Sequence, residues 1–384
     1  MRIGIVCYPT FGGSGVLATE LGKALAQKKH QIHFITYQQP VRLSEFVPNI
    51  FYHEVQVPPY PLFDYPPYET ALASTMVDVI KNNQLQLLHV HYAIPHASAA
   101  YMAKQILHQE GIDIPVITTL HGTDITLVGR DKMYAPVVAF SINQSDAITA
   151  VSQNLRDETF RTFKIEKPIE VIHNFVDVGR FKRKAIDAFK KVIAPNGEKI
   201  LLHASNFRKI KRVEDVVKIF HSVNQQIPSK LLFVGDGPER ATAEYLSRQL
   251  GVCDDVRFVG KQEQMEDILA IADLFLLTSE YESFGLAALE AMAAGVPVIS
   301  TNAGGLGEIM VEGVTGYMGN VGDIETMSER AVSMLQNDEH LQTFKDAALK
   351  HAQKFDINII IPLYEKLYDA VLIKNGSNAT MVEG

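Results

Sequence analysis

The sequence predicts an α/β protein with two Rossmann-like domains, each a doubly wound parallel sheet, facing one another across a cleft. Short, almost wholly apolar runs, as expected of parallel strands buried on both faces, alternate with stretches of helical periodicity. Polar and glycine-containing segments stand where these strands end. The alternation pauses once, near residues 174–197, and a chain of 384 residues is too long for a single core.

The first domain is predicted at residues 1–177. It opens with a strand at 2–8, and a glycine-rich turn, a helix at 16–29 and a strand at 31–37 complete a β-α-β unit. The proline- and aromatic-rich segment 57–67 is expected to be a long loop bordering a binding site. Further strands are expected at 85–91, 115–120, 147–151 and 169–173.

The second domain is predicted at residues 178–357. Its strands are expected at 199–204, 230–234, 256–259, 274–277 and 296–299, with helices at 213–223, 238–250 and 265–271. One more helix starts after Phe284-Gly285 and ends at Gly295. We expect residues 358–374 to form a helix that crosses back to the first domain and residues 375–384 to be a disordered tail.

The composition limits the function classes. A net charge of −8 and a pI near 5.9 argue against a nucleic-acid partner and against a basic patch for anionic membranes. There is no apolar run of transmembrane length and no signal peptide, so we expect a cytoplasmic protein without stable membrane insertion. Two cysteines, Cys7 and Cys253, indicate neither a disulfide framework nor a zinc site. The oligomeric state, a homo-oligomer included, stays open.

Glycines follow the first strand, where Gly13, Ser14 and Gly15 would let a ligand approach the backbone at a helix N-terminus. The alternative is a tight turn. The dinucleotide fingerprint is incomplete, and no acidic residue ends the strand at 31–37, so a dehydrogenase is disfavoured.

Two other strand ends of the first domain carry polar groups, and Arg130 follows the second of them. His89 and His91 share one face of a strand, but no third metal ligand stands at a suitable spacing, and Tyr92 follows them. His121 with Asp124 forms an acid–base couple, a polar anchor or, through Thr123 or Asp124, a helix cap. Arg130 either binds a carboxylate in bidentate fashion or is a solvated surface charge.

The second domain offers a basic segment after its first strand. The stretch from Asn206 to Arg212 contains four cations, Arg208 and Lys211 among them, which suit a pyrophosphate; the alternative is a solvated basic loop. Gly237 and Lys261 follow two further strands, and the backbone of the segment that ends at Lys261 could face a flat base.

Two glutamates flank a helix start in the same domain. Glu282 lies in the loop and Glu290 on the helix, so they can hold two parts of one ligand beside the backbone N–H groups of Ser283, Phe284, Gly285 and Leu286. The alternative is an amphipathic helix with two solvated glutamates. No Asp-x-Asp occurs, so we expect no metal and no cofactor.

Together these motifs resemble the retaining glycosyltransferases of the GT-B fold, family 4. The resemblance spans almost the whole chain and rests on motifs at 12–15, 121–124, 174–177, 211, 235–237, 282–290, 295–297 and 304–308. It implies that Glu290 holds the ribose hydroxyls of a nucleotide sugar, that Glu282 holds a sugar hydroxyl, and that His121 stands beside the reacting sugar.

The same resemblance implies that Lys211 contacts the pyrophosphate. The family's usual arginine five residues earlier is Asn206 here, so Arg208 is the substitute candidate. Tyr92, Thr123 and Arg130 are the candidates for the acceptor pocket, with Arg130 supplying a charge match to an acidic acceptor.

The runs at 7–15, 89–96 and 205–208 are similar to one branch of the family. That branch transfers N-acetylglucosamine from UDP-N-acetylglucosamine to L-malate, the first step of bacillithiol biosynthesis, with UDP-N-acetylglucosamine as a substrate and no metal. Two alternatives stay open: a family 4 transferase with a sugar phosphate, lipid or polysaccharide acceptor, and a UDP-N-acetylglucosamine epimerase.

Overall fold

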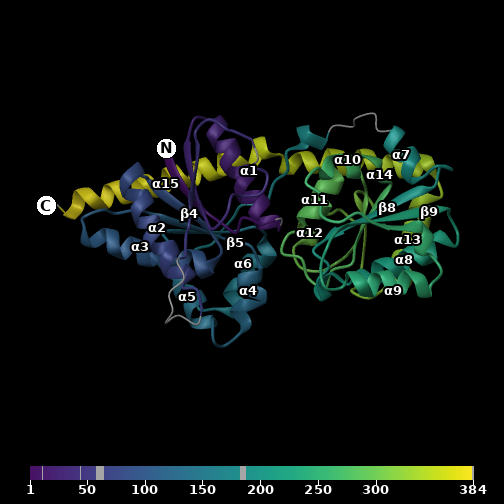
Figure 1. Ribbon diagram of the computed structural model, residues 1–384, viewed down its shortest axis with the longest axis horizontal. Coiled ribbons are helices and arrows are strands. Elements are labelled where there is room, and N and C mark those ends of the chain that lie inside the picture. Colours follow the sequence, from purple (N-terminus) through teal and green to yellow (C-terminus); the bar gives the residue numbers. More distant parts are fainter. Residues whose placement is uncertain (11, 44, 58–64, 182–186, 383–384) are drawn as a thin grey trace. The chain divides into compact units, whose positions relative to one another are not determined.

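The computed structural model describes residues 1–384 apart from 11, 44, 58–64, 182–186 and 383–384 (Figure 1). The chain forms two compact units. Unit 1 contains Met1–Asn174 and Asn358–Gly384, and unit 2 contains Phe175–Ile357. Most of the segment 57–67, predicted to be a loop, lies outside the described residues.

The sheet of unit 1 has seven strands in the order β3-β2-β1-β4-β5-β6-β7, and every described pairing is parallel. Alternate side chains of β4 point to opposite faces: Leu88 and Val90 pack in the core with helices α2 and α3, whereas His89 contacts Tyr368 of helix α15. The strands are β1 Arg2–Val6, β2 Gln31–Thr36, β3 Ile50–Glu54, β4 Leu87–His91, β5 Val116–Leu120, β6 Ala147–Ala150 and β7 Glu170–Val171.

Helices lie on both faces of this sheet (Figure 1). They are α1 Gly13–Gln27, α2 Tyr68–Asn83, η1 Ala93–Ala97, α3 Ser98–Gln109, α4 Thr123–Thr126, η2 Val128–Arg130, α5 Ala135–Gln144, α6 Gln153–Thr162 and α15 Ile357–Val382. Helix α15 contains Pro362 and continues to Val382, so it extends through most of the tail that we expected to be disordered. Adding residues to an existing helix avoids the cost of nucleation, which explains how a stretch without periodicity is helical.

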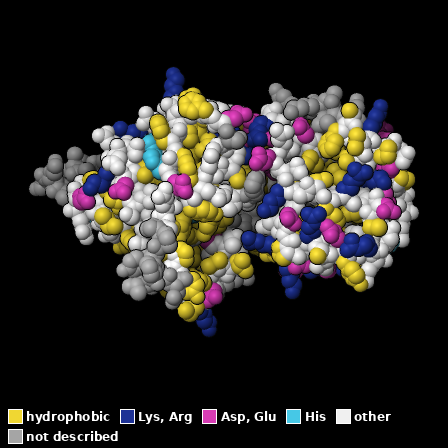
Figure 2. Space-filling model, viewed as in Figure 1, with side chains coloured by type: hydrophobic (Ala, Val, Ile, Leu, Met, Phe, Trp, Pro, Cys, Tyr) yellow, Lys and Arg dark blue, Asp and Glu magenta, His cyan; other side chains and the backbone are white. Residues whose placement is uncertain are grey.

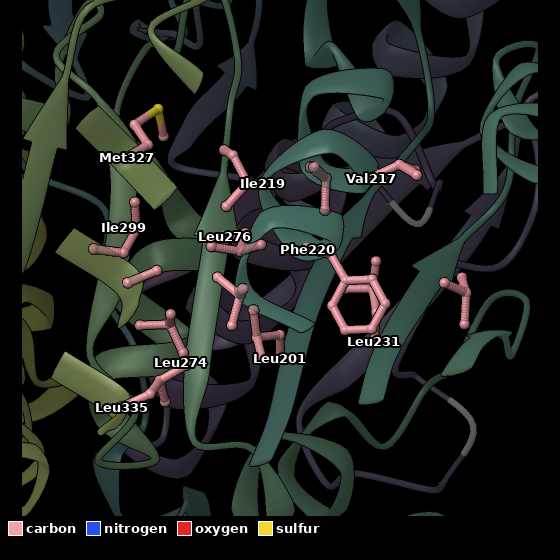
Figure 3. Close-up of a cluster of buried hydrophobic side chains, with 14 of the residues drawn as sticks. Leu201, Val217, Ile219, Phe220, Leu231, Leu274, Leu276, Ile299, Met327 and Leu335 are labelled. Atoms are coloured by element: carbon pink, nitrogen blue, oxygen red, sulfur yellow. The ribbon is translucent and has the colours of Figure 1, made fainter. Parts of the chain in front are cut away.

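The sheet of unit 2 has six parallel strands in the order β10-β9-β8-β11-β12-β13. One face packs against α8 and α13, where Leu201, Phe220, Leu276, Ile299 and Met327 form part of a continuous apolar core (Figure 3). The strands are β8 Lys199–Ser205, β9 Ser229–Gly235, β10 Val256–Phe258, β11 Leu274–Leu277, β12 Val298–Thr301 and β13 Gly316–Gly319.

The helices of unit 2 alternate with these strands, as the sequence predicts. They are η3 Val178–Phe181, α7 Asp187–Ile193, η4 Lys209–Lys211, α8 Val213–Asn224, α9 Arg240–Gln249, η5 Cys253–Asp255, α10 Met265–Ile271, α11 Leu286–Ala293, α12 Leu306–Ile309, α13 Ile324–Leu335, α14 Asp338–Ala352 and η6 Gln353–Phe355.

The surface carries mixed charge. On the face shown in Figure 2, the Lys and Arg side chains of unit 2 are interspersed with Asp and Glu. Of the helices in the described part of the chain, none combines the length and the apolar character that spanning a bilayer requires. Cys7 is a buried free thiol and Cys253 an exposed one.

Candidate active site

Each sheet reverses its strand order at one point, and the carboxyl ends of the strands on either side of such a point form the usual ligand-binding position of an open parallel sheet. In unit 1 the reversal lies between β1 and β4, and in unit 2 between β8 and β11. The segments that follow these four strands contain the glycines at 12–15, Tyr92, Lys211 and Glu282. The topology therefore brings many of the predicted site residues to two positions, one in each unit.

In unit 2, Lys211 and Glu282 form a direct ion pair. The Lys211 Nζ lies 2.5 Å from Glu282 Oε1, and both side chains are largely buried, with 20% and 14% of their surface exposed. The Ser279 hydroxyl donates a second hydrogen bond to the same carboxylate oxygen at 2.7 Å. Glu282 is thus held by two donors and lies beside the cation assigned to the pyrophosphate.

Backbone contacts fix the basic segment between β8 and α8. The Thr278 hydroxyl lies 3.0 Å from the carbonyl oxygens of both Lys211 and Arg212, and the Glu280 N–H donates to the carbonyl of Ile210 at 2.8 Å. Phe207 is fully buried, although its φ of +38° lies in the left-handed region that non-glycine residues seldom adopt. These contacts hold the backbone of the segment in place, which distinguishes it from a solvated basic loop, the alternative interpretation.

The other donor-site candidates around this segment are exposed. Asn206 and Arg208 are both exposed, and the Arg208 side chain has no hydrogen bond or ion pair among the described residues. Gly237 lies against the segment, because a Cβ built on it would be 2.1 Å from the carbonyl oxygen of Asn206. Lys261 follows β10, the outermost strand of the sheet, and is exposed, so it lies apart from the Lys211–Glu282 pair in the strand order.

Gly304 and Gly305 pack against the backbone of Glu282. The Gly305 N–H donates to the Glu282 carbonyl at 2.7 Å. A Cβ on Gly304 would come within 2.1 Å of the same oxygen, and one on Gly305 within 2.4 Å of the Ser283 carbonyl oxygen. Only glycine permits this approach of two backbone segments.

Helix α11 starts where the sequence predicts, at Leu286, after Gly285 in a left-handed conformation with φ of +95°. Phe284 is buried and packs edge-on against Phe355, which fixes the turn that precedes the helix. The first turn of a helix offers N–H groups without intrahelical acceptors and attracts an anion. Glu290 lies in the second turn and is half-buried.

In unit 1, Ser14 and Tyr92 contact one another. The Tyr92 hydroxyl donates to Ser14 Oγ at 2.7 Å. We predicted that Gly13, Ser14 and Gly15 form a turn before the helix. In the structure they form the first turn of α1 itself. A Cβ on Gly15 would lie 2.4 Å from the Tyr8 carbonyl oxygen, so the close contact with the segment that follows β1 explains the glycine there.

Tyr92 adopts an unusual backbone conformation, with φ of +84° and ψ of 141°. Such values are uncommon outside glycine, and they cost on the order of 1–3 kcal/mol where the surroundings enforce them. The ring packs against those of Tyr8 and His121, with centroids 5.3 Å and 5.1 Å away. The local structure thus holds the Tyr92 hydroxyl next to the start of α1 at the expense of backbone strain.

His121 follows β5 and accepts or donates a hydrogen bond between its Nε2 and His91 Nδ1, at 2.8 Å. Asp124 does not cap α4, whose N-cap is Gly122, but accepts hydrogen bonds from the N–H groups of Ala93 and Gly122, both at 3.0 Å. Burial raises the pKa of Asp124 to about 6 although these hydrogen bonds lower it. Asp124 is therefore a polar anchor joining the segments after β4 and β5, not a partner of the His121 ring.

The two remaining acceptor candidates are Thr123 and Arg130. Thr123 is exposed and opens the short helix α4. Arg130 ends η2, and its side chain lies outside the described residues.

The sequence did not predict a site role for Ser279 or His96. Ser279, which donates a hydrogen bond to Glu282, lies two residues after the end of β11, and the only signal for it is its position three residues before that glutamate. His96 donates from Nδ1 to the carbonyl of His91 and is fully buried. Among the described residues, no group of three or more His, Cys, Asp or Glu side chains is arranged to hold a metal ion.

Comparison with known families covers both units. Residues 11–180 match the family model described as Glycosyltransferase Family 4, and residues 185–351 match that of Glycosyl transferases group 1. The chain is 47% identical, over 98% of its own length and 99% of the relative's, to the N-acetyl-alpha-D-glucosaminyl L-malate synthase of Bacillus anthracis.

Solved structures with the same fold have lower identity. Anabaena HepE in complex with UDP and glucose superposes with a TM-score of 0.80 at 19% identity, covering 96% of this chain and 99% of that one. The sucrose-phosphate synthase of Thermosynechococcus elongatus gives a TM-score of 0.79 at 21% identity, covering 97% and 100%. At these identities the likeness establishes the fold of two parallel-sheet units.

Proposed function

Since this chain belongs to the family 4 glycosyltransferases, which have the GT-B fold, we propose that it transfers N-acetylglucosamine from UDP-N-acetylglucosamine to the hydroxyl group of L-malate. One observation carries this choice of substrates: the 47% identity over nearly the full length of both chains to a synthase named for that product. The reaction would be the first step of bacillithiol biosynthesis. Its small polar substrates are cytoplasmic metabolites, so we assign the protein to the cytoplasm.

The stereochemical outcome follows from the name of that relative. Its product is an alpha-glucosaminyl compound. The sugar of UDP-N-acetylglucosamine is also in the α configuration, so an α product requires retention at the anomeric carbon. We therefore infer retention of configuration.

Unit 2 has the charges that a nucleoside diphosphate needs. Lys211 has three N–H donors, of which one is directed at Glu282, so the others remain available to a pyrophosphate. Arg208 adds a second cation from the same segment, and the start of α11 adds backbone N–H groups. Glu290 is assigned to the ribose hydroxyls and Glu282 to a sugar hydroxyl, the roles that these positions have in the family.

A single displacement on one face of the sugar accounts for retention with these residues. The malate hydroxyl oxygen forms the new bond to the anomeric carbon on the face from which UDP departs, and the bond between that carbon and the β-phosphate oxygen breaks. The hydroxyl proton passes to the departing phosphate oxygen, while Lys211 and Arg208 stabilise the negative charge that develops there. Glu282 is engaged by Lys211 and Ser279 and so is a poor candidate for a carboxylate nucleophile, which argues against double displacement.

The acceptor is assigned to unit 1. Tyr92 and Ser14 offer two hydroxyls in contact, Thr123 offers a third, and Arg130 would supply the positive charge that a dicarboxylate requires. Of the two alternatives, an epimerase lies outside the family to which the chain belongs. A different acceptor within the family remains the competing hypothesis, and the identity to the L-malate synthase favours malate.

The decisive experiment incubates the purified chain with UDP-N-acetylglucosamine, with and without L-malate. We expect UDP release only when malate is present, a product with the mass of the malate glycoside, and an anomeric coupling constant in its NMR spectrum typical of the α linkage. We expect the rate to survive EDTA, since we propose a metal-free site. Isomerisation of the donor without malate, or turnover with another acceptor only, would refute the assignment.

The donor site is tested separately by Glu290→Ala. Leaving ribose hydroxyls without a charged partner costs on the order of 1.5–3 kcal/mol, so the Kd for UDP is expected to rise about 10- to 100-fold by calorimetry. Glu325→Ala, an acidic residue in the first turn of α13, is the control and should leave the Kd unchanged. An unchanged Kd in the Glu290 variant contradicts the ribose assignment.

A further inference from the structure

Four histidines of unit 1 gather at the carboxyl ends of β4 and β5. Three of them are almost fully buried, and the fourth, His121, is half-buried. Three of the rings stack in the order His89, His91, His121. The centroid distance is 4.5 Å between His89 and His91 and 5.0 Å between His91 and His121. We call this set the histidine cluster; its members are His89, His91, His96 and His121.

The hydrogen bonds of the cluster restrict where its protons lie. A carbonyl oxygen only accepts, so His96 Nδ1, which contacts the His91 carbonyl, carries a hydrogen. His89 is bonded on both sides, by the Tyr368 hydroxyl at Nδ1 and the Thr119 hydroxyl at Nε2, each at 2.7 Å. The remaining question is which ring donates in the 2.8 Å contact between His91 Nδ1 and His121 Nε2.

Both of these rings are neutral at pH 7. Burial, with smaller contributions from the other cluster members, lowers the pKa of His121 to about 3 and that of His91 well below its usual value. The groups that act on the His91 ring are the other three histidines of the cluster. Two neutral imidazoles share one hydrogen in such a contact, so one ring is the donor and the other the acceptor.

The second nitrogen of His91 decides between the two arrangements. His91 Nε2 is buried and has no hydrogen-bond partner among the described residues. A buried N–H without an acceptor is rarer and more costly than a buried lone pair without a donor. The hydrogen of His91 therefore lies on Nδ1 and is donated to His121 Nε2, which leaves His121 to carry its own hydrogen on Nδ1.

We propose that His91 is a positioning residue that holds His121 in the Nδ1–H form, so that His121 offers the reacting sugar a hydrogen-bond donor and not a base. The proposal rests on the proposed function, and it takes the position of His121 beside the reacting sugar from the family resemblance. It agrees with the transfer of the malate proton to the departing phosphate, because a neutral Nδ1–H imidazole whose Nε2 is already engaged cannot accept that proton.

Two substitutions of His91 separate position from packing. In His91→Asn the side-chain amide nitrogen occupies about the place of Nδ1 and can still donate to His121, whereas His91→Leu removes the donor and fills a similar volume. We expect the Leu variant to lose about 10- to 100-fold in kcat, the usual effect of removing a group that orients a functional histidine, with little change in KM for UDP-N-acetylglucosamine. The Asn variant should recover most of the loss.

A matched control lies in the same unit. His33 is buried on β2, its Nδ1 bonds His53 Nε2 at 2.9 Å, and its Nε2 has no partner among the described residues, so its environment parallels that of His91 away from the cluster. His33→Leu should lower stability to a similar degree and leave kcat unchanged. Equal losses of kcat in the two Leu variants, or no recovery in the Asn variant, would overturn the proposal.

A direct measurement of the tautomer does not depend on catalysis. In the full chain labelled with ¹⁵N-histidine, ring nitrogen shifts distinguish Nδ1–H from Nε2–H, and we expect His121 to be Nδ1–H in the wild type and in His91→Asn. A wild-type Nε2–H form refutes the proposal even if the enzyme makes the expected product. If the Nδ1–H form is found and lost in His91→Leu while kcat holds, the positioning role in catalysis is overturned and the proposed overall reaction is left standing.

Discussion

The ion pair between Lys211 and Glu282 links stability to catalysis in unit 2. In the structure the Lys211 Nζ lies 2.5 Å from Glu282 Oε1, and both side chains are at least four-fifths buried. We therefore predict that Lys211→Met lowers both the stability of unit 2 and kcat.

The size of the stability loss follows from the contacts. A hydrogen bond between charged groups contributes about 1.5–3 kcal/mol, and methionine retains the apolar stem of the lysine, so packing changes little. Glu282 keeps the Ser279 hydroxyl as a donor, which limits the penalty. We expect a loss of about 2 kcal/mol, which lowers the Tm of a unit of this size by roughly 4–8 °C.

Calorimetry on a double-mutant cycle checks this estimate. Lys211→Met, Glu282→Gln and the double variant should show a coupling free energy of about 1–3 kcal/mol, as expected of residues in direct contact. Lys230→Met is the matched control, because Lys230 is 19% exposed, pairs with Asp255 at 2.5 Å and lies on β9 outside the candidate site. It should lower Tm similarly and leave kcat unchanged, whereas Lys211→Met should lower kcat at least 100-fold. Additivity within about 0.5 kcal/mol would refute the reasoning for the pair.

Two further predictions concern pH and the glycine at the basic segment. Burial keeps the pKa values of the histidine cluster below 6.5 in the folded chain, so the unfolded chain binds more protons and unit 1 should lose stability as pH falls from 6.5 to about 4, by about 1.4 kcal/mol for each unit of pKa difference. Asp124 has the opposite sign: its raised pKa adds stability that is complete below pH 3.8 and lost as pH rises through about 6, and urea unfolding across this range should still show a net fall towards acid. Gly237→Ala should raise KM for the donor, because its Cβ would lie 2.1 Å from the Asn206 carbonyl oxygen, whereas Gly307→Ala, which meets nothing within 4 Å, should not; equal KM values would show that the segment shifts freely.

The sequence predicts the strands that form apolar runs. The runs that became β1, β4, β8 and β11 are nearly all apolar because helices cover both faces of the sheet, and the predicted bounds differ from the observed ones by a residue or two. Two strands were missed at the sheet edges, β3 and β13. The first is largely exposed and the second has glycine at both ends, so neither shows the apolar run on which the prediction depends.

Reliance on local sequence preference explains the error at the start of α1. Glycine disfavours a helix interior, so the sequence places Gly13 and Gly15 in a turn. In the structure the first helical turn packs so closely against Tyr8 and Thr10, which follow β1, that no Cβ fits at Gly15. Tertiary contact, not local preference, decides where this helix begins.

The sequence predicted each site residue separately, from its position after a strand. It did not predict which of these residues contact one another. Lys211 and Glu282 lie far apart in the sequence and meet because β8 is the neighbour of β11 in the sheet, while β9 and β10 are added on the other side. Strand order depends on where each successive β-α element is added to the sheet, and the sequence pattern alone does not show it. The motif shows that both residues follow strands, and only the topology shows that they neutralise one another.

The histidine cluster shows that the contacts of a motif can come from distant parts of the chain. His89 and His91 share one strand face, and the sequence offers no third metal ligand at a suitable spacing. In the fold, each ring nitrogen that could bind a metal on His89 is taken by the hydroxyls of Tyr368 and Thr119, and His91 points its Nδ1 at His121. Tyr368 comes from α15, almost at the far end of the chain, so the residue that makes the first histidine structural lies nearly three hundred positions away. His121 is the half-buried member of the cluster, and we propose that its neighbour His91 sets its protonation through the contact between their rings.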